Sequence, residues 1–259
     1  MIPIKDYAGP RRRLPWITWG LIVVNGVVFL YQVSLGPDAS AFMFAYGVVP
    51  AAITHGIPQT SLPGVPTGLP FQTPNLVYLT LITTQFIHAG WLHIGGNMLF
   101  LYIFGDNVED RLGHIPYLVF YLFCGIIAGL TQIFVDPNST IPSVGASGAI
   151  AGVLGSYIVL FPWAGVRTIV FLFVFVTIVT LPAIILIGVW FVLQFFNGVA
   201  ALSTVQQGMG GVGYFAHVGG FVMGLVITLV LRPLLQAPGR VSYPYLPSHR
   251  NAGDRSGWW

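Results

Sequence analysis

The sequence predicts an all-α polytopic membrane protein, a bundle of six transmembrane helices. Of its 259 residues, 55% are hydrophobic and 7% are charged, whereas a soluble domain contains roughly 25% charged residues. The mean hydropathy is +0.81, and one helical span needs about 20 predominantly apolar residues. The third observation is the placement of the basic residues, which fall only in alternate connections between the apolar segments.

The apolar segments predict the six helices in order along the chain. We expect them at residues 16–35, 91–105, 115–135, 144–161, 168–197 and 212–231. The fifth is longer than one span requires, and Pro182 divides it. Its first part, residues 169–175, is rich in β-branched and aromatic residues. We therefore expect an interfacial segment there, with the true span beginning near Leu181.

The charge pattern predicts the topology. The first basic group is Lys5 with residues 11–13, and the next two are Arg111 and Arg167. The remaining arginines follow the sixth span, at positions 232, 240, 250 and 255. Because connections rich in Lys and Arg stay in the cytosol, both termini are predicted to be cytosolic. An odd number of spans would break this segregation.

The chain is expected to form one membrane domain with unstructured ends. Residues 1–15 form a cytosolic segment, residues 16–232 the membrane domain, and residues 233–259 a flexible tail broken by prolines. The acidic turn at 106–111 predicts a helix cap and an ion-pair network rather than a site. The sequence contains no phosphate-binding loop and no Cys/His metal cluster, and its single cysteine, Cys124, excludes an internal disulfide.

Four polar residues lie inside segments that are otherwise suited to lipid. Ser147 and His217 suggest a nucleophile and its general base. His93 and Asn97 are four residues apart and share a helix face, where their side chains could hold an oxyanion together with the Ser147 N–H. The second, fourth and sixth spans run in the same direction, and all four residues fall in the first turns of these spans. They are therefore predicted to meet at one depth, below the outer surface, in a polar cavity that admits water.

Two glycine pairs predict close helix packing. Gly148 and Gly152 lie one turn apart in the fourth span, and Gly220 and Gly224 lie one turn apart in the sixth. Small residues at this spacing allow helix backbones to approach closely. A hydrogen bond between Ser147 and His217 would require such an approach.

These residues resemble the motifs of the rhomboid intramembrane serine proteases. The motifs are HIGGN at 93–97, GASG at 145–148, AHVGG at 216–220 and FGDNVEDRLG at 104–113. The resemblance covers residues 16–231 and implies a six-helix core and a Ser147–His217 dyad that cleaves substrates near the ends of their transmembrane helices. It also implies that no cofactor is needed and that the partners are transmembrane substrates and lipid, with no role for nucleic acid.

The resemblance has two departures and one extension. Many members carry a tyrosine under the histidine ring at the position of Ala151, so the group that holds the His217 ring is unassigned here. The first external loop also lacks the Trp-Arg pair of some members. By similarity, the fifth span could form a lateral gate for substrate through Trp190, Phe191, Gln194 and Phe195.

Two other functions fit the composition less well. A non-catalytic rhomboid-like protein that escorts membrane helices would be marked by loss of the serine or the histidine, and both are present. A transporter or channel would often show repeats and charges at the midplane, and this sequence has neither. A short six-span core favours a prokaryotic cell membrane over an organelle, and the sequence leaves the oligomeric state open.

Overall fold

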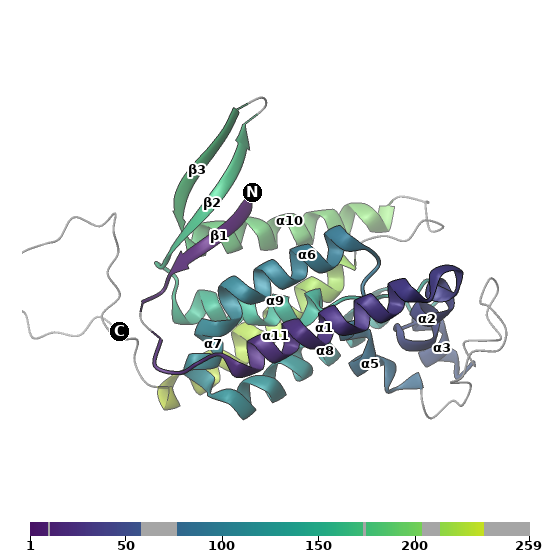
Figure 1. The fold of residues 1–259 in the computed structure, drawn as a ribbon. Coiled ribbons are helices and arrows are strands. Elements are labelled where there is room, and N and C mark those ends of the chain that lie inside the picture. Colours follow the sequence, from purple (N-terminus) through teal and green to yellow (C-terminus); the bar gives the residue numbers. More distant parts are fainter. Residues whose placement is uncertain (10, 58–76, 173–174, 204–212, 236–259) are drawn as a thin grey trace, which may run out of the picture.

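The computed structural model describes residues 1–9, 11–57, 77–172, 175–203 and 213–235. Figure 1 shows a bundle of helices with a small sheet that projects from one end. Within these described ranges, four helices are long and apolar enough to cross a membrane: α1 (Trp16–Ser34), α8 (His114–Val135), α10 (Ala183–Ser203) and α11 (Tyr214–Leu231). Shorter helices make two further passes through the bundle. One is α6 (Trp91–Phe100) continued by the π-helical segment η4 (Leu101–Gly105), and the other is α9 (Ser147–Leu160).

The helical membrane fold that the sequence predicts is confirmed, with one large shift of boundary. The fifth helix begins at Ala183 and ends at Ser203, so the predicted span of 168–197 is wrong at both ends. The expectation of a start near Leu181 is confirmed to within two residues. The sixth helix begins at Tyr214, and Val212, the predicted start, lies outside the described residues. Most of the predicted tail, residues 236–259, also lies outside them.

A three-stranded antiparallel sheet replaces the first part of the predicted fifth span. Strands β2 (Gly165–Leu172) and β3 (Phe175–Pro182) pair with each other, and β1 (Ile2–Tyr7) adds to the other edge of β2. Ile2 pairs with Ile169 and Tyr7 with Gly165. The β-branched and aromatic residues of this segment favour a strand. The expectation of an unstructured N-terminal segment is therefore wrong for residues 2–7.

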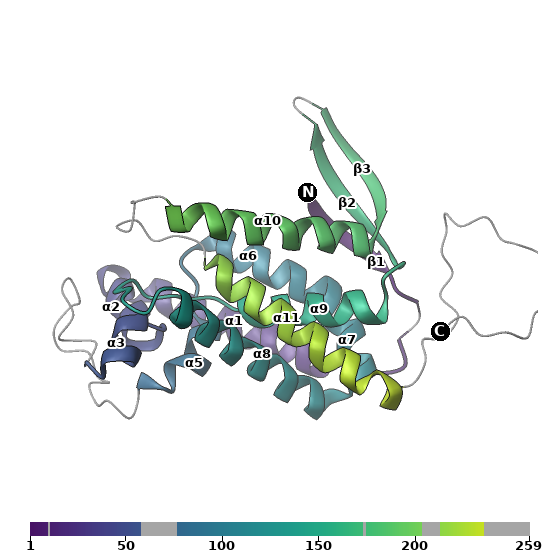
Figure 2. The ribbon, with the colours of Figure 1, turned by 180° about the vertical axis from the view of Figure 1, so that it is seen from behind.

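Helix α9 lies at the centre of the bundle. Every residue from Gly148 to Tyr157 is buried, because α8, α10 and α11 surround it together with α6 and η4. Helices α9 and α11 pack against each other, and both lie below α10 in the view of Figure 2. A helix that is apolar on all its faces is suited to a protein interior or to a membrane span, and α9 is both short and enclosed by other helices. This arrangement places Ser147, the first residue of α9, inside the bundle.

The connections meet at two opposite ends of the bundle. At one end, the loops before α6 and before α9 are joined where Gly145 N–H donates to the Thr84 carbonyl at 3.0 Å. The loop after α1 joins them through a short β-bridge between Val48 and Ser143. At the other end, Arg11 forms an ion pair with Asp106 at 2.7 Å. The connections that the charge pattern assigns to one side therefore contact one another.

The acidic turn caps a neighbouring helix, as the sequence predicts. Glu109 lies in α7 (Asp106–Leu112) and is fully buried. Its carboxylate accepts hydrogen bonds from the N–H groups of Ile17 and Thr18 at 2.9 and 2.8 Å, and from the Thr18 hydroxyl at 2.6 Å. Helix α1 has no side-chain cap of its own, and the first N–H groups of a helix need acceptors. Glu109 therefore joins α1 to the second pass of the chain.

The two glycine pairs lie where α9 contacts α11. A Cβ atom on Gly220 would overlap the carbonyl oxygen of Gly148, and a Cβ atom on Gly224 would overlap the carbonyl oxygen of Gly152. Backbones this close leave no room for any side chain larger than hydrogen. The glycines thus determine the distance between the helices that carry Ser147 and His217.

Candidate active site

Ser147 and His217 form a direct hydrogen bond. His217 Nε2 lies 2.7 Å from Ser147 Oγ. Ser147 begins α9 and His217 lies in the first turn of α11, so both side chains are near the same end of the bundle. His217 is buried, with 9% of its surface exposed. The pair has the geometry that a nucleophile and a general base require.

A second hydrogen bond determines which nitrogen of His217 faces the serine. His217 Nδ1 lies 2.7 Å from Oε1 of Gln194, which is on α10. An amide oxygen can only accept a hydrogen bond, so Nδ1 carries the proton in this arrangement. Nε2 is then left with its lone pair and can accept the Ser147 hydroxyl proton.

An aromatic side chain of α10 also lies beside the His217 ring. The Trp190 ring lies 5.8 Å from the His217 ring, with an angle of 35° between the planes. Ala151 is fully buried and offers only a methyl group. Apart from the hydrogen bond to Ser147, the contacts that orient the His217 ring therefore come from α10.

The four residues predicted to form a gate separate into two groups. Trp190 and Gln194 contact His217, as described above. Phe191 stacks on Phe221 of α11 at 4.4 Å, and Phe195 is 44% exposed and lies against Phe196. The contact of Gln194 with the histidine is not predicted from the sequence, where Gln194 is a candidate gate residue. The available signal was an uncharged amide in an apolar helix, since polar groups at such positions are costly and tend to have a partner.

His93 presents a hydrogen-bond donor close to Ser147. The Ala89 N–H donates to His93 Nδ1 at 3.3 Å, so the other ring nitrogen, Nε2, carries the proton. His93 Nε2 lies only 2.8 Å from the position that a Cβ atom on Gly145 would occupy. Gly145 also has a φ of +130°, which favours glycine. The glycine two residues before Ser147 thus gives His93 access to the serine.

Other donors lie nearby. Asn97 is buried, and its Nδ2 has no hydrogen-bond partner among the described residues. In α9, the first N–H group bonded to the residue four positions before it is that of Ile150. The N–H groups that precede it, at Ser147 and Gly148, lie at a helix N-terminus, where partial positive charge accumulates. A buried donor without a partner is costly, so this arrangement suits an anion formed during a reaction.

His88 lies beside these groups. Its ring lies edge-on to the His93 ring at 5.1 Å, and its carbonyl accepts a hydrogen bond from Gln32 of α1 at 2.8 Å. His88 thus ties α1 to the loop before α6 and packs His93 in place.

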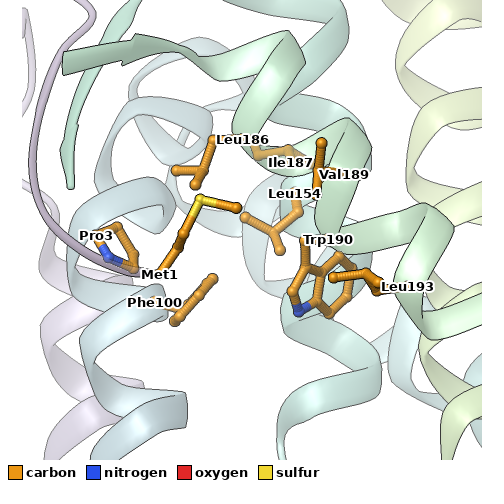
Figure 3. A pocket seen from close by; sticks show the side chains of 9 residues that line it. All are labelled: Met1, Pro3, Phe100, Leu154, Leu186, Ile187, Val189, Trp190 and Leu193. Carbon is orange, nitrogen blue, oxygen red and sulfur yellow. The ribbon is translucent and has the colours of Figure 1, made fainter. Parts of the chain in front are cut away.

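Two cavities flank the dyad. A cavity of 40 Å³ is lined by polar groups of Thr84, Ser143 and Ser147, which is enough room for a water molecule. A second cavity, of 130 Å³ and largely apolar, lies between α6, α9, α10 and the N-terminal residues Met1 and Pro3, and it includes Leu154 and Trp190 in its lining. Figure 3 shows the Trp190 side chain at one side of this apolar cavity.

Comparison with known proteins identifies a family that this chain matches. The family model described as Rhomboid domain matches residues 76–234. Rhomboid-like protein 11, chloroplastic, of Arabidopsis thaliana is 27% identical over 228 residues, which are 88% of this chain and 69% of that protein. Rhomboid protein 1, mitochondrial, of Saccharomyces cerevisiae is 31% identical over 57% of this chain and 40% of that protein.

The relatives include a protein described as non-catalytic. Inactive rhomboid protein 1 of Drosophila melanogaster is 32% identical over 92 residues, 36% of this chain and 6% of that protein. The family match covers more than half of the chain, and the long apolar helices make it an integral membrane protein. The chain belongs to the rhomboid family.

Proposed function

We propose that the protein is a serine endopeptidase that hydrolyses peptide bonds in or beside the transmembrane helices of membrane-protein substrates. The observation that carries this proposal is the 2.7 Å hydrogen bond between Ser147 Oγ and His217 Nε2. Membership of the rhomboid family supports an intramembrane protease function in general. The presence of both residues argues against the escort function, which one inactive relative makes the natural alternative.

The chemistry proceeds in two half-reactions. Ser147 Oγ attacks the scissile carbonyl carbon while His217 Nε2 takes its proton. The tetrahedral oxyanion is held by donors from His93, Asn97 and the Ser147 N–H. The His217 imidazolium then gives its proton to the leaving amine, and the C–N bond breaks to leave an acyl-enzyme on Ser147. Water, deprotonated by His217, attacks the ester and releases the carboxylic acid and the serine.

Substrate access is proposed to be lateral, between the second pass and α10. The apolar cavity of Figure 3 lies between these elements, with Trp190 and Leu193 of α10 on one side and Phe100 of α6 on the other, and Met1 and Pro3 complete its lining. Unwound substrate backbone is tolerated in a membrane only where protein or water satisfies its polar groups. This requirement confines cleavage to the neighbourhood of Ser147 and its polar cavity.

The membrane orientation follows from the charges. We place residues 16–232 in the membrane domain, with residues 1–15 and 233–259 on the cytoplasmic side of a prokaryotic cell membrane. Ser147 is then near the outer surface, and the sheet β1–β3 lies on the cytoplasmic side. With this orientation, the protein would cut substrates near the outer ends of their transmembrane helices.

Purified protein, with Ser147→Ala and His217→Ala variants, tests the function on a single-span reporter in liposomes. We expect the wild type to cleave the reporter and to react with a fluorophosphonate, and both variants to fail in both assays. Folded wild-type protein that binds the reporter helix but neither cleaves several reporters nor reacts with the probe would support the escort function instead.

A further inference from the structure

We infer that Gln194 is a positioning residue, which holds His217 in the tautomer that leaves Nε2 free to act on Ser147. The inference rests on the proposed function, because it has meaning only if His217 is the general base. It assigns to α10 the orienting role for which the α9 side chain at position 151 is too small.

The geometry supports a chain of two hydrogen bonds. Gln194 Oε1 lies 2.7 Å from His217 Nδ1, and His217 Nε2 lies 2.7 Å from Ser147 Oγ. The amide oxygen has no proton to give, so it fixes the Nδ1–H form. In the other tautomer the proton would sit on Nε2, facing the serine, and two lone pairs would oppose each other at Nδ1. With its amide oxygen toward Nδ1, as in this structure, Gln194 therefore favours the form that can act as a base.

A second contact from the same helix face fixes the plane of the ring. Trp190 lies four residues before Gln194, so both side chains project from one face of α10. The centre of the Trp190 ring lies 5.8 Å from the centre of the imidazole, and the two planes are tilted by 35°. Trp190 alone would allow the imidazole to turn within its own plane. The hydrogen bond to Gln194 prevents this motion, because hydrogen bonds are directional.

The role differs from that of a gate. The outer surface of α10 is exposed at Val192, Leu193, Phe195 and Phe196. A residue that only closed the entrance would slow the passage of substrate, and its removal would leave the reaction of Ser147 with a small reagent unchanged or faster. A positioning residue acts on the serine itself, so its removal would slow the reaction with reagents of every size.

The test uses the rate at which a small fluorophosphonate inactivates the purified full-length protein. Gln194→Met keeps the length and packing of the side chain but removes the acceptor, and we expect inactivation to slow by about 5- to 10-fold, the size of one neutral hydrogen bond. Gln194→Glu keeps an acceptor at the same reach, and because a charged acceptor binds the Nδ1–H at least as strongly as a neutral one, we expect its rate to be no lower than that of wild type. Val192→Ala, on the exposed face of the same helix, is the matched control and should react like wild type.

Three results would overturn the inference. Inactivation of Gln194→Met at the wild-type rate would assign Gln194 to the gate, and equal losses in the Met and Glu variants would assign it to packing. If wild-type protein reacts no faster than Ser147→Ala, both the proposed function and this inference fail. The first two results leave the proposed function intact, so the two failures are distinguishable.

The tautomer can be measured directly. In protein labelled with ¹⁵N-histidine, protonated and unprotonated ring nitrogens resonate at different positions, and His217→Ala identifies the signals of this residue. We expect a protonated Nδ1 in wild type and in Gln194→Glu, and a mixture of tautomers in Gln194→Met. An unchanged Nδ1 signal in Gln194→Met would contradict the inference even if the variant were slow.

Discussion

Gly148 is predicted to be essential for the position of Ser147, which it follows directly. In Gly148→Ala the new Cβ would lie 2.5 Å from the Cβ of Ala128 on α8. Two carbon atoms in contact are about 3.5–4.0 Å apart, so α8 and α9 would have to separate by roughly 1 Å. Neither side can yield by rotating a bond, because both atoms are attached directly to helix backbones.

The expected size of the effect follows from this displacement. Overpacking of a core by one methyl group destabilises a protein by about 1–3 kcal/mol. A shift of about 1 Å at a reacting group can lower the rate by about 100-fold. We therefore expect Gly148→Ala to remain folded, with a lowered unfolding temperature, and to lose most of its activity.

The assay combines thermal unfolding with the rate of reporter cleavage, and Ala128→Gly provides the compensating change. The double variant removes the clashing methyl group and should recover most of the rate, apart from about 1 kcal/mol of stability lost to glycine in a helix. Gly26→Ala is the control, because a Cβ there meets nothing within 4 Å. Activity of Gly148→Ala within twofold of wild type, or a double variant no faster than the single one, would refute the reasoning.

Four further predictions concern the donors, the carboxylates and the topology. Asn97→Ala should lower kcat by about 100-fold while KM changes little, because an oxyanion donor contributes about 3 kcal/mol to the transition state; an equal kcat would remove Asn97 from the site. Glu109→Gln should lower the unfolding temperature, since it replaces a charged acceptor of three hydrogen bonds to Ile17 and Thr18 by a neutral one; an unchanged temperature would exclude a stabilising cap, and Asn138→Ala serves as a surface control. Burial, with Asp6 nearby, raises the pKa of Asp106 from 3.8 to about 7. The folded state therefore binds this proton more tightly than the unfolded state, and the resulting stabilisation is present below about pH 4 and lost as pH rises through 7. Asp106→Asn should reduce the change of unfolding temperature between pH 5 and 8, and an unchanged slope would contradict this. Cysteines at Thr140 and Trp163, both exposed, should react with an impermeant thiol reagent from opposite faces of a sealed vesicle, and labelling from one face would reject the proposed topology.

Much of this protein is predictable from sequence because its strongest signals are local. The cost of placing polar groups in lipid sets the apolar segments, so every pass except the fifth lies close to its expected position, and the fifth begins near the alternative start at Leu181. Helical spacing places His93 and Asn97 on one face of α6. The common direction of the second, fourth and sixth passes places Ser147 and His217 at one depth.

The remaining features depend on contacts between distant segments. Strand β1 pairs with β2 across more than 150 residues of sequence, and no local pattern in residues 2–7 specifies that partner. Glu109 caps α1 from a helix that begins about 90 residues later. Both contacts form only after the bundle has brought these segments to the same end.

The sequence by itself determined the class of the protein, the candidate dyad and the helices that carry it, because hydropathy, spacing and charge act along the chain. Only the tertiary structure decided how His217 is held. The hydrogen bond from His217 to Gln194 joins α11 to α10, and hydrogen bonding depends on distance and direction to within a few tenths of an ångström. Helical periodicity gives the face on which Gln194 lies, whereas the packing of α10 against α11 determines what that face meets.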